Sequence, residues 1–458
     1  MNWKERFIRT VSYPLYEKSR GLTIRSKLHA LEAGRNRTPS EIQDLQLRKL
    51  RSLITDCGAR TPYYREMLER NGLTADSFQS LADLSRLPVL TKSLLRENRE
   101  VISQPGLFPR TYCHQSSGST GDPKVLCADT EAESFRMAAL FRSRRWWGWD
   151  IGSPVLEIWG TYHLQRSLMR NIRMSWIENR FRFSAMRLTD ASAAETWKLF
   201  RKHRGAYVRG YVSSILGIAR LFEESGRHPA ELGFRAVCTT SERLYDDQRR
   251  FLESAFRCPV IDEYGASEVG IIAFQCPSGG MHLMEENLIA EFADLPQAGP
   301  DGPKRLILTE LNNRATPLLR YEIGDLVRPD PEPCACGSAL SRIRVDIGRD
   351  SEMVRLPDGS QVSPVLFCHM GQYSFFEIGR KIRQYRIIQK RLDLFEVEVV
   401  CRTEDQADVE SYFRKAFEED FDGLVRLNVR FRDSIPPDAS GKHRMFISEI
   451  PTGGSESG

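Results

Sequence analysis

Hydrophobic residues in the first part of the chain recur with the spacing of an α-helix. Between residues 40 and 50, apolar side chains stand three and four positions apart, so a helix places them on one face. Ser40 and Gln43 can form a capping box at the start of this helix, and a further short helix is expected after residues 87–92. We therefore predict that residues 1 to about 90 form a mainly helical lead-in.

From about residue 110 the hydrophobic runs become shorter and alternate with helical patterns. Four runs have the length and composition of buried strands: 155–159, 206–211, 236–240 and 259–264. Helical patterns lie between them at 214–224 and 246–256. Because strands that alternate with helices are typical of a sheet covered by helices, this region predicts an α/β architecture.

The pattern changes again near the pair Gly348-Arg349. After a strand at 305–310, further strands are expected at 384–389, 394–400 and 425–431, with a helix at about 407–418. These elements suffice for a small α+β domain. We predict a large N-terminal domain of several subdomains over residues 1–347, a small C-terminal domain over 348–452, and a disordered Gly/Ser-rich tail over 453–458.

The composition of the 458-residue chain is typical of a globular enzyme, with 41% hydrophobic and 28% charged residues. It contains no run of the roughly 20 apolar residues that span a bilayer and no apolar run after the charged start, so we expect a cytoplasmic chain without a secretory signal. The net charge of +5 does not by itself indicate nucleic acid. The ten cysteines show no obvious disulfide framework and are expected to be reduced.

Arginine and tryptophan residues are interleaved between positions 142 and 187. The interpretation we favour is an amphipathic helix with solvated arginines and buried tryptophans. A surface that meets a membrane or an anionic substrate stays open as the alternative.

A loop rich in glycine and hydroxyl residues, from Ser117 to Lys124, gives the strongest chemical signal of the chain. Glycines let the backbone turn tightly and present several N–H groups to one anion, while the hydroxyls add donors and the lysine adds positive charge. This pattern indicates a polyphosphate site and hence ATP, although a Gly/Ser-rich surface turn has the same composition. It differs from a P-loop, in which lysine directly follows glycine.

Three later segments carry residue types that suit a nucleotide site. Tyr264 and Glu268 lie in Tyr-Gly-x-x-Glu at the end of an expected strand, where an aromatic ring can stack on a base and a carboxylate can hold Mg²⁺. Asp325 follows a glycine and can accept hydrogen bonds from ribose hydroxyls. Lys442 follows a glycine near the end and can stabilise charge during phosphate displacement. Taken singly, each segment is also an ordinary turn.

The order of these motifs resembles the adenylate-forming superfamily of acyl-CoA synthetases. The Ser/Thr/Gly loop, Tyr-Gly-x-x-Glu, Arg-Tyr-x-x-Gly-Asp, the Gly-Arg pair and the late Gly-Lys follow one another as in that family. The chain is most similar to the phenylacetate–CoA ligase-like branch, which includes the capsule-biosynthesis proteins called CapK. Residues 61–66 and 87–92 also look like that branch.

The resemblance implies a two-step reaction, in which a carboxylic acid and ATP give an acyl-adenylate and pyrophosphate, and a thiol such as that of coenzyme A then displaces AMP. The C-terminal domain is expected to rotate between the steps and to supply Lys442 for the first. The resemblance also implies these roles: Ser117, Ser119, Thr120, Gly121 and Lys124 on the phosphates, Tyr264, Ser241 and Glu242 at the adenine, Glu268 on Mg²⁺, Asp325 on the ribose, and Arg349 beside the nucleotide.

The chain departs from the family pattern at the hinge. Ser351 stands where the family commonly has an aspartate, and residues 355–360 replace a glycine-rich stretch. No residues match the CoA contacts of other members, so the acceptor stays open between CoA and an amine or hydroxyl, such as that of a surface polysaccharide. A scaffold of the same fold without turnover is the further alternative.

Four residues can also form a metal site. Cys276 and His282 are separated by five residues, and Cys334 and Cys336 by one, with glycines beside both pairs. Three sulfurs and one imidazole suit tetrahedral Zn²⁺. Unrelated thiol and imidazole groups in separate turns are the alternative.

Overall fold

The computed structural model describes most of the chain and divides it into two compact units. The first unit comprises Met1–Leu244, Leu252–Ile323 and Val327–Arg344, and the second comprises Tyr245–Phe251, Gly324–Leu326 and Val345–Gly458. The described residues are 2–116, 124–159, 174–184, 193–295, 302–349, 354–358, 361–362, 367, 381–421, 423–436 and 444–450. No helix of these residues is long and apolar enough to cross a membrane.

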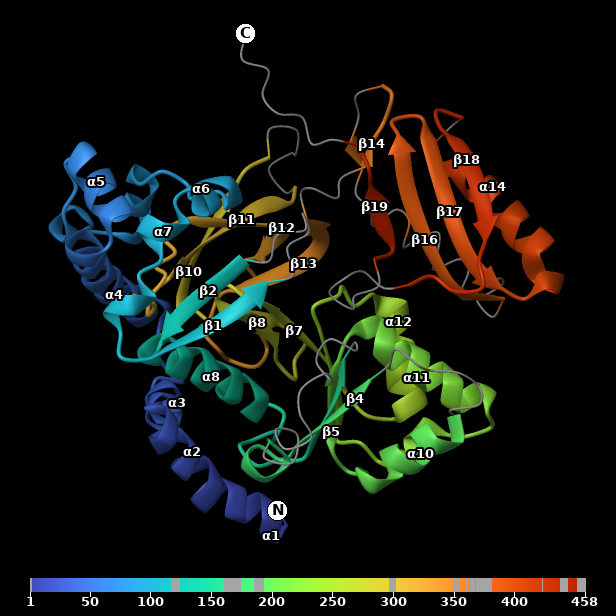
Figure 1. Ribbon diagram of the computed structural model, residues 1–458, viewed down its shortest axis with the longest axis horizontal. Coiled ribbons are helices and arrows are strands. Elements are labelled where there is room, and N and C mark those ends of the chain that lie inside the picture. The colour runs from blue at the N-terminus through green and yellow to red at the C-terminus, as the bar shows by residue number, and fades with distance from the viewer. Residues whose placement is uncertain are drawn as a thin grey trace. The chain divides into compact units, whose positions relative to one another are not determined.

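Helices dominate the first hundred residues (Figure 1). The 22-residue helix α4 begins at Pro39, with Thr38 and Glu41 forming the capping box. The expected box of Ser40 and Gln43 is therefore wrong by two residues, because proline fits the first helical turn, where its missing N–H is not needed. The helices are α1 Trp3–Phe7, η1 Ile8–Ser12, α2 Tyr13–Arg20, α3 Ile24–Ala33, α4 Pro39–Arg60, α5 Pro62–Arg70, η2 Ala75–Ser77, η3 Leu81–Arg86, α6 Lys92–Glu97, α7 Arg99–Ile102 and η4 Pro105–Leu107.

A large mixed sheet forms the centre of the first unit. Among the described residues it has eleven strands in the order β10-β11-β12-β13-β9-β8-β7-β6-β5-β3-β4, and β4, β3, β5, β6 and β7 are mutually parallel. Its strands are β3 Val155–Trp159, β4 Arg180–Ser184, β5 Tyr207–Gly210, β6 Ala236–Thr240, β7 Val260–Ala266, β8 Gly270–Gln275, β9 Met281–Leu283, β10 Leu288–Ala293, β11 Lys304–Glu310, β12 Tyr321–Asp330 and β13 Arg342–Arg349. A separate antiparallel hairpin joins β1 Thr111–Ser116 to β2 Lys124–Asp129.

The inner parallel strands β3, β5 and β6 are mostly buried, which explains their largely apolar sequences. All five residues of β6 are buried. Val155, Cys238 and Ile261 pack in one core cluster with Ala138 and Phe141 of helix α8, while α11 contacts β3 and β6. The helices of this region are α8 Thr130–Arg145, α10 Ala193–Lys202, α11 Val212–Glu224, η8 Pro229–Leu232 and α12 Asp246–Phe256.

The second unit has its own sheet and its own core. In the four-stranded sheet β18-β17-β16-β19, β16 and β17 are antiparallel, whereas the outer pairs are parallel. Phe413, Phe417 and Phe421 of α14 pack with Phe367 and Phe395. The elements are β14 Val354–Arg355, β15 Gln361–Val362, β16 Ile382–Arg391, β17 Leu394–Cys401, η11 Thr403–Asp405, α14 Gln406–Phe421, β18 Arg426–Phe431 and β19 Phe446–Ser448. The predicted α/β fold with a smaller α+β C-terminal part is confirmed.

We predict that Gly152 is indispensable where the first helix meets the sheet. Its φ is +87°, and a Cβ there would lie 2.7 Å from the carbonyl oxygen of Glu5. Gly152→Ala should lower the free energy of unfolding by about 3 kcal/mol, from backbone strain plus overpacking. The control Gly205→Ala has φ +73° but open space around the Cβ, so it should lose only about 1 kcal/mol. Equal losses in denaturant titrations would contradict this.

Candidate functional site

A buried carboxylate, Glu310 at the end of β11, is the centre of a hydrogen-bonded cluster. Its side chain is fully buried and accepts two bonds from Arg136 of α8, from Nε at 2.6 Å and from Nη2 at 2.7 Å. Burial alone lowers the pKa of Arg136, but the charge and hydrogen bonds of Glu310 outweigh it and raise this pKa. A bidentate pair of this kind fixes the two side chains in one geometry.

Arg136 also fixes the turn that carries Glu268. Its Nη2 donates to the backbone carbonyl of Glu268 at 2.6 Å, in the turn between β7 and β8. Gly270 has φ +78°, and a Cβ there would meet Cγ of Arg136 at 3.1 Å, so glycine allows the arginine to lie against the turn. Ser267 donates to the Glu268 carboxylate at 3.1 Å. The backbone of the half-buried Glu268 is thus held by a residue far from it in sequence, while its carboxylate contacts the neighbouring Ser267.

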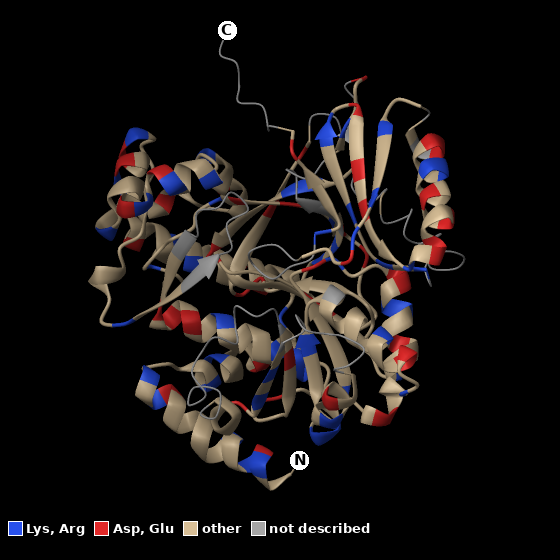
Figure 2. Cartoon of the chain, turned by 45° about the vertical axis from the view of Figure 1, so that its right-hand side comes forward, with Lys and Arg blue, Asp and Glu red and all other residues tan. Residues whose placement is uncertain are grey.

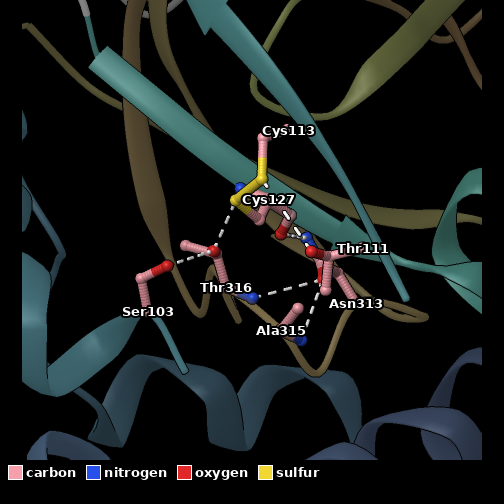
Figure 3. Close-up of a disulfide and its surroundings, with 7 residues drawn as sticks. All are labelled: Ser103, Thr111, Cys113, Cys127, Asn313, Ala315 and Thr316. Atoms are coloured by element: carbon pink, nitrogen blue, oxygen red, sulfur yellow. Dashed lines mark hydrogen bonds between the residues drawn. A yellow bond between two sulfur atoms is a disulfide. The ribbon is translucent and has the colours of Figure 1, made fainter. Parts of the chain in front are cut away.

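The Glu310 carboxylate also connects to the hairpin β1–β2 through Asn313. Figure 3 shows Asn313 and Thr316 beside Cys127 of this hairpin. Asn313 Nδ2 donates to Glu310 at 3.2 Å and to the carbonyl of Cys127 in β2 at 3.3 Å. Thr316 Oγ1 accepts from the Cys127 N–H at 3.2 Å and lies 2.8 Å from the Ser103 hydroxyl. One buried carboxylate therefore connects the Glu268 turn with the hairpin that carries the Ser/Thr/Gly loop.

The hairpin contains a disulfide between Cys113 and Cys127, so the expectation that all ten cysteines are reduced is wrong for this pair. The two residues are directly opposite in the β1–β2 ladder. Fourteen positions separate them in sequence, and that spacing alone does not reveal a cross-strand partner. The disulfide joins the two strands on either side of the loop.

The loop residues Ser117, Ser119, Thr120 and Gly121 lie outside the described residues. Lys124 begins β2, where the backbone is described. The loop thus starts and ends in a hairpin whose base is fixed by Asn313 and Thr316.

Ser241, Glu242 and Tyr264 come together at the carboxyl edge of the parallel strands. Thr240 of β6 is paired with Glu263 of β7, so Ser241 and Tyr264 follow on neighbouring strands. Ser241 has φ +67°, a left-handed conformation that is uncommon for a residue with a side chain and is concentrated at functional sites. In open α/β sheets ligands bind outside this edge, and the half-buried ring of Tyr264 offers a surface on which a planar base can stack.

A network of buried ions that the sequence analysis missed lies next to this edge. Arg209 of β5 binds Glu263 bidentately, with Nε 3.2 Å from each oxygen, and its Nη1 lies 3.6 Å from Glu157 of β3. Glu157 also pairs with Arg180 and Arg182 at 3.2 Å. Burial raises the pKa of Glu263, but Arg209 and the other arginines outweigh it and lower this pKa. Charged residues inside otherwise apolar strands were the sequence signal for this network.

Three further predicted residues lie elsewhere in the chain. Asp325 is half-buried in β12, and Arg349 is the last residue of β13, where the backbone is described. Lys442 lies outside the described residues. Asp325 and Arg349 are grouped with the second unit.

The four predicted metal ligands form one compact cluster in the first unit. The ligand atoms of Cys276, His282, Cys334 and Cys336 all lie within 4.8 Å of one another. The Sγ atoms of Cys276 and Cys334 are 3.6 Å apart, and Cys336 Sγ lies 3.2 Å from His282 Nε2. His282 Nδ1 lies 2.8 Å from the Leu340 carbonyl, a contact that leaves Nε2 directed at the sulfurs. Burial lowers the pKa of His282, which favours the neutral imidazole that binds metals.

Gly280 makes room for this cluster. A Cβ at this position would lie 2.8 Å from Cys334 Sγ and 3.2 Å from His282 Nε2. The Cys276 N–H donates to the Gly280 carbonyl at 2.8 Å, and the Gly279 N–H donates to the Cys276 carbonyl at 2.9 Å. This tight turn brings the side chains of Cys276 and His282, which can bind a metal, close to those of Cys334 and Cys336.

The sequence is similar to phenylacetate-coenzyme A ligases and to protein CapK. The chain is 25% identical over 327 residues to phenylacetate-coenzyme A ligase of Thermus thermophilus, covering 69% of this chain and 72% of the relative. It is 22% identical over 425 residues to protein CapK of Staphylococcus aureus, covering 92% of each. No protein-family model matches.

The structural comparison agrees. The crystal structure of 2-hydroxyisobutyryl-CoA ligase with R3-HIB-AMP has a TM-score of 0.69, with 18% identity and 91% of both chains covered. The chain is similar in sequence and in fold to adenylate-forming ligases. The resemblance to the phenylacetate–CoA ligase-like and CapK branch, read from the motif order, is confirmed. In this chain, the residues that the motifs single out at Ser241, Tyr264 and Glu268 lie at or beside the carboxyl edge of the sheet.

We predict that the Arg136–Glu310 pair is essential for the stability of this protein. Arg136→Met leaves the fully buried Glu310 without its cation, so the free energy of unfolding should fall by about 3–5 kcal/mol. The control Arg414→Met removes an exposed arginine that pairs with Glu410 at 2.7 Å, and it should change stability little. Chemical denaturation of both variants measures the difference, and a similar small loss in each would refute the role of the buried pair.

Proposed function

We propose that this ligase activates a carboxylic acid with ATP, forming an acyl-adenylate and releasing pyrophosphate, and then transfers the acyl group to a thiol such as that of coenzyme A. The observation that carries the proposal is the shared anchoring of the Ser/Thr/Gly hairpin and the Glu268 turn on Glu310. The names of the relatives support it, since several are phenylacetate-coenzyme A ligases, and the structurally similar ligase holds an acyl-AMP.

The proposed nucleotide site uses both anchored elements. Ser117, Ser119, Thr120, Gly121 and Lys124 would hold the phosphates with backbone N–H groups, hydroxyls and one ammonium. Tyr264, with Ser241 and Glu242 on the next strand, would contact the adenine, and Asp325 would accept hydrogen bonds from the ribose. The Glu268 carboxylate suits Mg²⁺, a hard cation that takes oxygen ligands and supplies positive charge against the phosphates.

The chemical step follows from these positions. The substrate carboxylate attacks the α-phosphorus, the bond to the bridging oxygen of pyrophosphate breaks, and the negative charge moves onto pyrophosphate. Lys442 and Arg349 would stabilise that charge as it develops, and such preorganised charge is usually a large contribution to catalysis. Transfer then requires a thiolate to attack the acyl carbon while AMP leaves.

We further propose that residues 348–452 form a mobile domain that alternates between the two steps. The second unit has its own phenylalanine-rich core, so it can move as one body. Ser351, where the family commonly has aspartate, need not prevent rotation, because a hinge only has to accept a change in backbone angles. Lys442 would be required for adenylation and would withdraw for transfer.

Transfer to an amine or hydroxyl in surface polysaccharide synthesis is the second candidate. The similarity to protein CapK spans 92% of both chains, a larger share than the match to the Thermus thermophilus ligase. Supplying the protein with a preformed acyl-adenylate and either CoA or an amine shows which of the two accepts the acyl group.

The Cys/His cluster fits a structural Zn²⁺. Three thiolates and one imidazole are a common tetrahedral donor set, and the four ligand atoms already lie within 4.8 Å of one another, beside Gly280. Bound at Cys276, His282, Cys334 and Cys336, zinc would tie the β8–β9 turn to the segment before β13. It would stabilise the fold and take no part in the reaction.

The proposed function predicts acid-dependent exchange of pyrophosphate into ATP. With a panel of carboxylic acids, the wild-type ligase should catalyse exchange, whereas Lys442→Ala should lose about 100-fold or more and still convert a supplied acyl-adenylate. Lys390→Ala, which removes a lysine paired with Glu449 at 2.7 Å in the same unit, is the control and should keep full activity. Absence of exchange with every acid would favour the inactive scaffold, and equal losses in both half-reactions would exclude alternation.

For zinc we predict one ion per chain in protein purified without chelators. Elemental analysis should find it in the wild type and in Cys401→Ser, a thiol outside the cluster, and should not find it in Cys334→Ser/Cys336→Ser. The double variant should also melt at a lower temperature, because metal binding is folding free energy. Wild-type protein without metal, or with metal unaffected by the double substitution, would disprove the site.

A further inference from the structure

The first helical run of the chain exposes a stripe of large hydrophobic residues. Trp3, Phe7, Val11 and Leu15 are 71%, 41%, 42% and 62% exposed, and Trp176 beside them is 48% exposed. Across the described residues, nine large hydrophobic side chains are exposed, and these five gather at one place. Large exposed apolar patches rimmed by polar residues often mark sites that bind proteins or membranes.

The geometry of the helical run keeps the exposed residues Trp3, Phe7, Val11 and Leu15 on one side of the helix. In an α-helix each step of four residues overshoots a full turn by about 40°, so four residues at this spacing would wind around the helix. Here the run is α1, then the π-helical segment η1 at Ile8–Ser12, then α2. The wider π turn rotates less per residue and counteracts the drift. π segments of this kind often mark functional sites.

The charges of the same run are arranged by sign. Residues 2–20 contain five basic side chains and two acidic ones. Both acids are buried on the inner side, where Glu5 pairs with Arg235 at 3.2 Å and Glu17 binds Arg25. The basic residues Arg6 and Lys18 are exposed, and Lys4, Arg9 and Arg20 are partly exposed. In Figure 2 this run, near the N label, is largely tan. Its outer surface therefore offers apolar groups and positive charge.

An apolar groove of about 410 Å³ runs along the stripe. It is open to solvent, and most of its lining is apolar, from Phe7, Val11, Leu15, Tyr16 and Ile177. The polar residues that line it are Ser12, Ser19 and Arg20. Lys4 Nζ lies 5.1 Å from the ring centre of Trp176, which places a cation next to the second exposed tryptophan. Such a groove can receive the acyl chains of anionic lipids, while the lipid headgroups contact the cations beside it.

We propose that the stripe Trp3, Phe7, Val11 and Leu15, with the cations around it, docks this ligase on the surface of an anionic lipid bilayer. The run would lie in the plane of the interface, as amphipathic helices with aromatic and aliphatic residues on one face and basic residues on the other do. A second copy of this chain fits the stripe poorly. In a two-fold dimer the same surface of both subunits meets, so the basic residues around the stripe would face one another. An anionic bilayer complements both the charge and the apolar surface.

Vesicle sedimentation of the full chain tests this docking. The wild type should sediment with vesicles of phosphatidylcholine and phosphatidylglycerol and remain in solution with phosphatidylcholine alone or at high salt. Phe7→Ser/Leu15→Ser should reduce the partition coefficient about tenfold or more. Arg6→Gln/Lys18→Gln should reduce it about fivefold for each cation removed. The control Leu107→Ser/Leu424→Ser changes two exposed leucines elsewhere and should bind like the wild type.

Two results would overturn the proposal. One is wild-type protein that stays in solution with anionic vesicles, and the other is binding that the Phe7→Ser/Leu15→Ser variant retains. Light scattering without lipid measures the oligomeric state. If the wild type is a dimer and the Phe7→Ser/Leu15→Ser variant is a monomer, the stripe binds a second copy of the chain instead of a bilayer. Because all substituted residues are at least partly exposed, unchanged thermal unfolding of the variants confirms that folding is intact.

Discussion

The need to neutralise one buried carboxylate organises the candidate site. An unpaired charge at the fully buried Glu310 would be very costly, so Arg136 and Asn313 must both be in place when the chain is folded. Arg136 in turn holds the backbone of the Glu268 turn, and Asn313 holds the base of the β1–β2 hairpin. A helix, a strand end, a turn and a hairpin from four parts of the sequence are thereby fixed relative to one another.

The parallel sheet adds the second constraint. Its strands carry Glu157, Arg209 and Glu263 in the middle of apolar sequence, and these residues neutralise one another across β3, β5 and β7. Such a network holds neighbouring strands in one register, because a slip of one residue would separate every pair. Tyr264 lies in β7 next to Glu263, and Ser241 directly follows β6, whose last residue pairs with Glu263. The edge that presents them is therefore rigid even though the strained Ser241 backbone is unfavourable by itself.

Elements with local signals could be predicted from the sequence, whereas contacts between distant residues could not. Strands expected at 155–159 and 236–240 are β3 and β6, and the helix expected at 246–256 is α12, because periodicity and length are local properties. The Cys/His cluster was found because metal ligands form a recognisable set. The Arg136–Glu310 pair spans 174 positions, and the cross-strand partners Cys113 and Cys127 depend on hairpin register, so no local pattern announces them.

The central claim is that the two elements anchored by Glu310 bind the same magnesium nucleotide. The most direct measurement is a crystal structure of the protein with ATP and Mg²⁺ or with a stable acyl-adenylate analogue. The account predicts an adenine against Tyr264 beside Ser241, phosphates on the loop between β1 and β2, and the metal at the Glu268 carboxylate. A nucleotide bound elsewhere, or a metal with no contact to Glu268, would contradict it.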